Sequence, residues 1–246
     1  MAQYHWLSLL EKISRNQPWT EELAEYFHLS PAKVLTNFYK KKLLANRLWR
    51  QKARRTNSQI FSFYSETDYF VYRQKWFNRH KAFWDIALPL FLKHQGWFCE
   101  YGSGIGPVTS WLIKLFPNWH YTLVDLDCPA LQFARWRFQR YHNIDFKIVR
   151  SEKLPLTQNY DVITCKQVFE HVPNALDLVK HLVAHLRPGG WLYLDYIWKS
   201  GDENLSQSSQ QRKQVLTYLS TRLQPVLAIN PASHEEGYGL YLKPSL

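Results

Sequence analysis

The chain has 246 residues, 46% of them hydrophobic, which is enough for one ordinary domain with a smaller appendage. Its 16% aromatic content exceeds what a core requires and indicates a site or interface lined by flat rings. Three cysteines without a CxxC pair exclude a disulfide framework and a structural zinc site, and favour a reducing, cytoplasmic location. The sequence has no signal-peptide pattern and no run of about 18 apolar residues, so we expect no membrane span and no membrane partner.

The net charge of +11 is concentrated in the first third of the chain. Residues 1–92 hold 15 of the 31 Lys and Arg residues but 7 of the 20 Asp and Glu residues. The densest stretch, Lys40 to Arg55, has eight basic residues and no acid. Such a stretch would steer an anionic partner, although a solvated helix face is the simpler interpretation.

Residues 1–92 are predicted to be helical, because apolar residues recur at helical spacing and glycine is almost absent. Ser30-Pro31 predicts a helix start, since a Ser hydroxyl caps free amides and Pro suits the first helical position, so two helices should meet near Leu29. We also expect a helix leading into the second half of the chain, with one apolar stripe. Its members are Trp76, His80, Phe83, Trp84, Ala87, Leu88 and Phe91.

From Trp97 onward, short apolar runs alternate with amphipathic stretches. This alternation predicts an α/β fold with a doubly wound parallel sheet. The predicted strands are 97–100, 121–125, 144–149, 160–165 and 191–197. The predicted helices are 107–116, 129–141, 174–186 and 207–223. The runs 226–229 and 239–242 predict an antiparallel hairpin at a sheet edge, so we divide the chain into a helical region, 1–92, and an α/β domain, 93–246.

A glycine-rich turn follows the first predicted strand. The strand ends at Glu100, and Gly102 and Gly104 let the backbone approach a ligand before a helix begins at Pro107. A carboxylate two residues before the first glycine would repel a pyrophosphate but suits a cofactor with a cationic amino group. Asp125 ends the next strand, where it can accept hydrogen bonds from both hydroxyls of a ribose.

Five segments in order, EYGSGIG, LVDLD, SEKLPL, YDVITCKQVFEHV and LRPGGWLYLD, resemble the successive motifs of class I S-adenosylmethionine-dependent methyltransferases. The resemblance covers about residues 97–246. It implies a seven-stranded sheet whose last strand is antiparallel, S-adenosylmethionine as the cofactor and S-adenosylhomocysteine as the product. An unrelated Rossmann-like domain is the alternative.

The resemblance also implies a set of cofactor contacts. Glu100, Gly102 and Gly104 would lie along the methionine part, Asp125 would hold the ribose and Leu126 would pack on the adenine. Tyr101 and Ser103 belong to the same turn, and the backbone of Lys166 would touch the methionine amino group. Many relatives place an Asp that binds the adenine amino group where this chain has Arg150, so Ser151 or Glu152 would substitute.

Catalytic candidates follow the fourth predicted strand. Glu170 and His171 form the pair, with His171 either a general base or an orienting residue. Some quinone-precursor O-methyltransferases hold a divalent metal here with two acids and a histidine. This chain has Gln167 at the first acid position, so we expect no metal site.

The N-terminal region offers an acceptor lid and a possible partner surface. The lid candidates are the aromatic and histidine side chains Tyr69, Tyr72, Trp76 and His80, whereas Trp84 is expected to pack the appendage onto the sheet. Residues 19–35 resemble a helix-turn-helix with Leu23, Ala24, Leu29 and Val34 at core positions. Such modules bind DNA in regulators and form dimerisation arms in some O-methyltransferases, and the second use would imply a homodimer.

The sequence therefore predicts methyl transfer to an oxygen or nitrogen atom of a small molecule. The alternative is a protein that binds or modifies nucleic acid through its basic N-terminal third. Binding to heparin or duplex DNA that weakens steeply with salt would favour the alternative.

Overall fold

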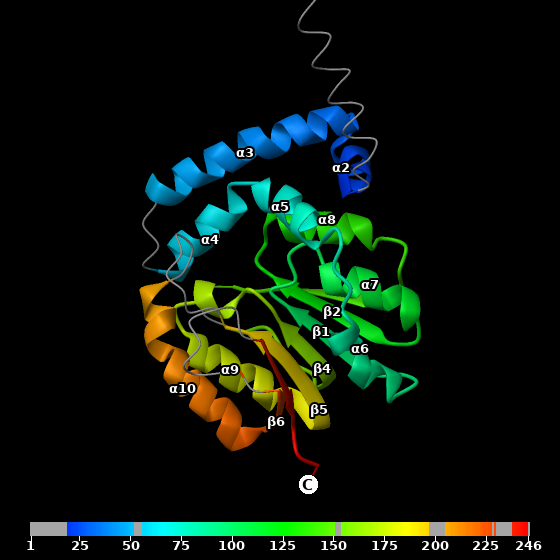
Figure 1. Ribbon diagram of the computed structural model, residues 1–246, viewed down its shortest axis with the longest axis vertical. Helices are drawn as coiled ribbons and strands as arrows, with labels where there is room; N and C mark the ends of the chain where they lie inside the picture. The colour runs from blue at the N-terminus through cyan, green and yellow to red at the C-terminus, as the bar shows by residue number, and fades with distance from the viewer. Residues whose placement is uncertain are drawn as a thin grey trace, which may run out of the picture.

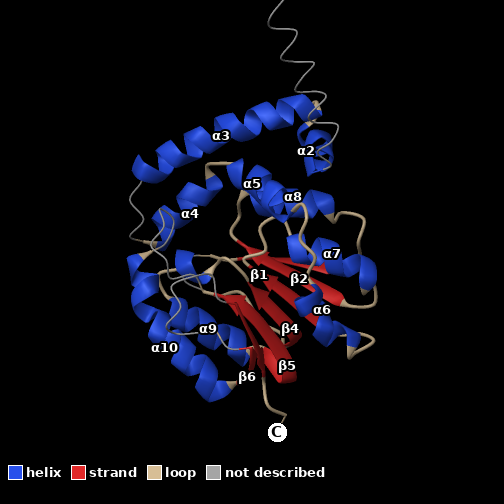
Figure 2. Cartoon of the chain, viewed as in Figure 1, coloured by secondary structure: helices blue, strands red, loops and turns tan. Residues whose placement is uncertain are grey.

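Seven strands form one mixed sheet in the order β3-β2-β1-β4-β5-β7-β6 (Figures 1 and 2). The computed structural model describes residues 19–51, 56–150, 154–196, 205–227, 229 and 238–245. Strands β1 to β5 pair in parallel, and β7 lies antiparallel between β5 and β6. Their bounds are β1 Trp97–Tyr101, β2 His120–Asp125, β3 Ile144–Ile148, β4 Tyr160–Cys165, β5 Leu186–Asp195, β6 Gln224–Leu227 and β7 Tyr238–Leu242.

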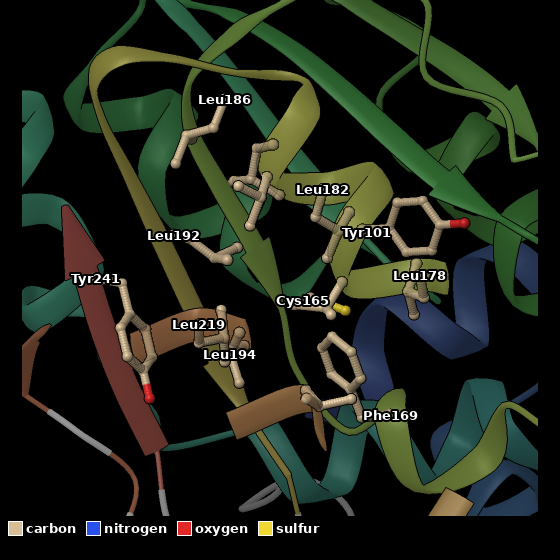
Figure 3. Packing of buried hydrophobic residues seen from close by; sticks show 14 of the residues in the cluster. Tyr101, Cys165, Phe169, Leu178, Leu182, Leu186, Leu192, Leu194, Leu219 and Tyr241 are labelled. Atoms are coloured by element: carbon tan, nitrogen blue, oxygen red, sulfur yellow. The ribbon is translucent and has the colours of Figure 1, made fainter. Parts of the chain in front are cut away.

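Helices cover both faces of this sheet, which confirms the doubly wound architecture. One face packs against α9 (Ala175–Ala184) and α10 (Ser206–Arg222), through Leu182 and Leu219 among others. Figure 3 shows this layer, with Tyr101, Cys165 and Phe169 pointing into it. The other face packs against α6 (Trp84–Phe91), α7 (Pro107–Leu115) and the end of α8 (Pro129–Arg137).

The N-terminal region is helical, as predicted, and packs on the α8 side of the domain. Its helices are α2 (Trp19–Phe27), α3 (Pro31–Gln51), α4 (Asn57–Ser65), α5 (Tyr69–Asn78) and α6. The Ser30-Pro31 start is confirmed, because the Ser30 hydroxyl accepts a hydrogen bond from the Lys33 amide at 3.3 Å. Leu23 and Val34 are fully buried, as a helix-turn-helix core requires.

The predicted single helix with its apolar stripe is wrong. The chain turns between the end of α5 at Asn78 and the start of α6 at Trp84, so helical spacing does not run through it. On α6 the buried side chains are Ile86, Ala87, Pro89 and Leu90, whereas Trp84, Leu88 and Phe91 are 51 to 61% exposed. Trp84 makes an edge contact with Trp111 of α7.

Strand β5 begins five residues earlier than predicted, because Leu186 already pairs with Tyr160 before a shift in register. The terminal hairpin is confirmed. Its strand β7 sits inside the sheet rather than at the edge, which β6 forms. The loop expected between the two strands lies almost entirely outside the described residues.

Candidate functional site

The turn between β1 and α7 places backbone amides at the carboxyl ends of the central strands. Gly102 and Gly104 have φ angles of +68° and +51°, which side chains with a Cβ rarely adopt. The Gly102 and Ser103 amides donate to the Val124 carbonyl at 2.8 and 3.0 Å, and so bind the turn to β2. An added Cβ at Gly102 would lie 2.0 Å from a methyl group of Val168, so only glycine fits there.

Asp125 ends β2 directly beside this turn. One carboxylate oxygen accepts the Gly104 amide at 2.5 Å, and the other accepts the Leu126 amide at 2.7 Å. Burial raises the pKa of Asp125 to about 6, although both amide bonds act to lower it. Each oxygen keeps a further lone pair, so the carboxylate can accept two ligand hydroxyls from a fixed position.

Glu100 makes its hydrogen bonds to the start of α7. Its carboxylate is buried and accepts the Val108 and Thr109 amides, at 3.2 and 2.8 Å, and the Thr109 hydroxyl, at 2.6 Å. Burial raises the pKa of Glu100 to about 7 against these bonds. The side chain therefore fixes the start of α7, and its predicted contact with the methionine part of the cofactor stays a prediction.

The remaining predicted cofactor contacts lie in different surroundings. Tyr101 is buried in the core, and Leu126 packs partly buried against the helical region. Ser103 is buried, and its hydroxyl has no hydrogen-bond partner within the described residues. Ser151 and Glu152 lie outside the described residues, so their predicted role stays a prediction.

The N-terminal helices reach the turn through one side chain that the sequence did not indicate. Gln74 of α5 accepts the Ile105 amide at 2.9 Å, and its amide group lies directly over Gly104. The Ile105 carbonyl accepts a hydrogen bond from Arg137 of α8 at 2.8 Å.

An ion-pair network holds Arg137 in place. Glu22 of α2 accepts two hydrogen bonds from Arg137, both 2.6 Å long, and one from Lys75 of α5 at 2.5 Å. Burial raises the pKa of Glu22, but the bonds and charges of Arg137 and Lys75 outweigh it and hold the pKa at about 2. Two helices of the N-terminal region and one of the domain thus converge on the glycine turn.

The two catalytic candidates lie together after β4. They form part of a short 3₁₀ helix, Phe169–His171, in which the Glu170 side chain is buried and His171 is 19% exposed. The His171 Nε2 atom lies 3.8 Å from a Glu170 carboxylate oxygen. The Tyr64 ring of α4 lies 6.2 Å from the imidazole and 5.0 Å from the Phe70 ring. This arrangement gives a histidine beside an acid, faced by an aromatic wall.

The segment between β4 and His171 is held by the end of β5. Gln167 adopts a φ angle of +56°, and Asp195 accepts its backbone amide at 2.5 Å and its side-chain amide at 3.0 Å. The Lys166 ammonium lies 5.1 Å from the Phe83 ring and 5.2 Å from the Tyr193 ring, so its side chain points toward α6 and β5. The predicted contact of its backbone with the methionine amino group stays a prediction.

The predicted acceptor-binding set does not converge on this site. Tyr69 and Tyr72 are buried in the packing of the helical region, where Tyr72 stacks on Phe27 at 5.0 Å. Burial raises the pKa of Tyr72 to about 12. Trp76 is 40% exposed and His80 lies on the surface. The role of this set in holding the acceptor stays a prediction, and the structure brings two other side chains of this region to the site, Gln74 at the glycine turn and Tyr64 beside His171.

Among the described residues, no group of three or more His, Cys, Asp or Glu side chains is arranged to hold a metal ion. Cys99, Cys128 and Cys165 are buried free thiols. Within the same residues, no helix is long and apolar enough to cross a membrane.

Comparison with known proteins gives one family match, to a methyltransferase domain, over residues 99–192. The chain is similar to the malonyl-[acyl-carrier protein] O-methyltransferase of Bacillus cereus, with 33% identity over 47% of this chain and 42% of that protein. It is also similar to the ubiquinone biosynthesis O-methyltransferase of Bordetella pertussis, with 35% identity over 29% and 31% of the two chains. The chain thus matches less than half the length of either relative.

Among solved structures, a putative O-methyltransferase from Klebsiella pneumoniae has the same fold. Its TM-score is 0.52 at 16% sequence identity, over 68% of this chain and 83% of that chain.

Proposed function

We propose, on the premise that residues 99–192 form a class I S-adenosylmethionine-dependent methyltransferase domain, that this protein methylates an oxygen or nitrogen atom of a small molecule. S-adenosylmethionine is the cofactor of this class and S-adenosylhomocysteine its product. The observation that carries the proposal is the fixed Asp125 carboxylate beside the glycine turn. Hydrogen bonds to such a charged acceptor are worth about 1.5 to 3 kcal/mol each.

The residues at this edge of the sheet fit the cofactor. Asp125 would accept the ribose hydroxyls and Leu126 would pack on the adenine. The buried Ser103 hydroxyl has no partner within the described residues, which suits a polar ligand at the glycine turn. Glu100 would act through the turn that it fixes.

The cofactor supplies a methyl group on an activated sulfonium, so the protein must mainly position the acceptor and exclude water, which is worth about 7 to 11 kcal/mol. When the acceptor is a hydroxyl, its proton must leave as the new bond to carbon forms. His171 would take that proton, a role worth about 10² to 10⁴ in rate. The Glu170 carboxylate, 3.8 Å away, would stabilise the resulting imidazolium.

Two observations support an oxygen acceptor with an apolar body. Tyr64 places an aromatic ring beside His171, with the Phe70 ring packed behind it, and rings of this kind bind flat or aliphatic groups. The two curated relatives named above are both O-methyltransferases.

Calorimetric titration with S-adenosylhomocysteine tests the proposal. We expect the wild-type chain to bind and Asp125→Ala to lose at least about 100-fold in affinity, because two hydrogen bonds to a charged acceptor are worth about 3 to 6 kcal/mol together. Asp127→Ala, which removes an exposed carboxylate two residues away, is the matched control and should bind like the wild type. A wild-type chain that does not bind, or equal affinities for the wild type and Asp125→Ala, would overturn the proposal.

A further inference from the structure

The outward face of α3 combines positive charge with large apolar side chains. Tyr39, Leu43 and Leu44 are 63, 72 and 51% exposed. On the same side of the helix lie four exposed cations, Lys33, Lys40, Arg47 and Arg50. The helix contains no Asp or Glu along its 21 residues. The opposite face of α3 is buried through Val34, Phe38, Ala45 and Trp49, so the outward residues are not needed for packing the region.

The charge of this face is not neutralised within the described chain. Lys41 pairs with Asp68 at 2.7 Å, but none of the four outward cations has an ion pair among the described residues. A hollow of about 430 Å³ opens at the end of the helix. Leu43, Asn46, Arg47, Arg50 and Gln51 line it, and all five belong to α3.

We propose that this outward face of α3 binds the surface of an anionic lipid bilayer. Four or more Lys and Arg residues on an amphipathic helix bind acidic headgroups, while exposed leucine and tyrosine side chains enter the boundary between headgroups and acyl chains. The exposed guanidinium groups of Arg47 and Arg50 would pair with headgroup phosphates, because guanidinium forks match phosphate oxygens. The inference does not depend on the proposed function.

Other partners fit this face less well. Nucleic acid would use the cations but leave Leu43 and Leu44 against water, since backbone phosphates offer no apolar surface. A second copy of the chain would bring two uncompensated basic faces together, and like charges opposite one another disfavour association. A bilayer satisfies both chemical features at once.

The placement of α3 permits such binding. The helix lies along the outer edge of the molecule, beyond α4 and α5 as viewed from the sheet (Figure 1). Its 21 residues span about 30 Å, long enough to lie flat on a surface. The early expectation of no membrane partner considered only spanning segments, and a helix lying on the surface needs none.

Co-sedimentation of the full chain with lipid vesicles tests the proposal. The probes are vesicles of phosphatidylcholine alone and of phosphatidylcholine with phosphatidylglycerol, at low and moderate salt. Each Lys or Arg near an anionic surface strengthens binding by about fivefold. The variant Lys40→Gln/Arg47→Gln/Arg50→Gln should therefore weaken binding to the anionic vesicles by about 100-fold.

Two further variants separate the contributions. Leu43→Gln/Leu44→Gln should weaken vesicle binding at least about tenfold without removing its salt dependence, since each buried CH₂ contributes about 0.8 kcal/mol. Both leucines are exposed, so folding should not suffer. The matched control is Lys180→Gln/Lys213→Gln/Arg222→Gln, which removes three exposed charges from α9 and α10 and should bind like the wild type.

The proposal is overturned if the wild type does not bind anionic vesicles, or if the α3 variants bind them as well as the control variant does. It is equally overturned when the leucine variant binds like the wild type and duplex DNA competes the protein off the vesicles, because the face would then be a phosphate-backbone site. Failure of cofactor binding leaves this result unaffected, so the two proposals fail separately.

Discussion

The network around Glu22 ties the N-terminal helices to the glycine turn, where we propose that the cofactor binds, and Glu22→Gln tests whether that link matters for binding. The substitution keeps the size of the side chain but removes the charge that holds Arg137 and Lys75. Arg137 would then lose the partner that aims its guanidinium at the Ile105 carbonyl in the glycine turn. We expect a looser turn and weaker cofactor binding.

The magnitude follows from the pKa of Glu22. It is about 2 in the folded chain against an ordinary 4.5, and each unit corresponds to 1.36 kcal/mol, which sets an upper limit near 3 kcal/mol. The Glu22 side chain is 29% exposed, so solvent screening reduces the stabilisation to about 2 kcal/mol. Burial lowers the pKa of Lys75 despite the neighbouring Glu22, so we assign most of this stabilisation to Arg137.

The sign of the pH dependence is fixed by the lowered pKa. The stabilisation is fully present above about pH 4.5 and is lost as the pH falls toward 2. Glu22→Gln should remove that dependence and lower the free energy of unfolding by about 2 kcal/mol at neutral pH. It should also raise the Kd for S-adenosylhomocysteine about tenfold, equivalent to 1.4 kcal/mol.

The control distinguishes positioning from general stability. Asp68→Asn breaks the Lys41 pair, whose side chains are 29 and 28% exposed and which ties α3 to the start of α5 away from the turn. It should lower stability without changing the Kd. Glu22→Asp keeps the charge on a shorter side chain. Compared with Glu22→Gln, it should restore part of the cofactor affinity, measured as a lower KM for the cofactor, while kcat at saturating cofactor changes little. Equal Kd values for Glu22→Gln and the wild type, with stability reduced, would refute the positioning role.

Three further outcomes are expected. Cofactor affinity should fall about tenfold per pH unit below pH 6, because the pKa of Asp125 is raised to about 6 and its protonated form accepts fewer hydrogen bonds. In calorimetry, the affinity of Asp125→Asn should not change with pH, whereas Glu100→Gln should keep the inflection near pH 6. Gly102→Ala should lower the free energy of unfolding in urea by about 1 to 2 kcal/mol from its positive φ angle alone, with a further loss from the clash with Val168. Adding Val168→Ala to this variant should relieve the clash, and a double variant with no gain in stability would mean that Val168 can move aside. His171→Ala should lower kcat about 10² to 10⁴-fold with cofactor Kd unchanged, and an unaltered kcat would leave it an orienting residue.

Local patterns were sufficient to predict the glycine turn, Asp125 and the strands. A strand that ends in an acid and a turn with closely spaced glycines are set by neighbours within a few residues, so their geometry can be inferred without the fold. The resemblance to class I methyltransferases then gave the number of strands and the antiparallel last strand. It did not give the orientation of Glu100, because the same acid can face either the helix or a ligand at this position.

The contributions of the N-terminal region could not be inferred in this way. Glu22 and Arg137 are separated by 115 residues, and no local periodicity links them. Gln74 is an ordinary helix residue until the packing of α5 places it over Gly104. The aromatic side chains singled out from the sequence were chosen for their type, and burial then assigned Tyr69 and Tyr72 to the core instead.

These contacts also bear on the division of the chain near residue 92. Trp19, Leu23 and Val34 of the helical region share one buried cluster with Leu131 and Phe133 of α8. Without residues 1–92, that cluster would lie open to water, and Arg137 and the Ile105 amide would lose the partners that now satisfy them. The sequence boundary therefore separates two kinds of local pattern, whereas the physical unit that holds the glycine turn includes side chains from both sides of it.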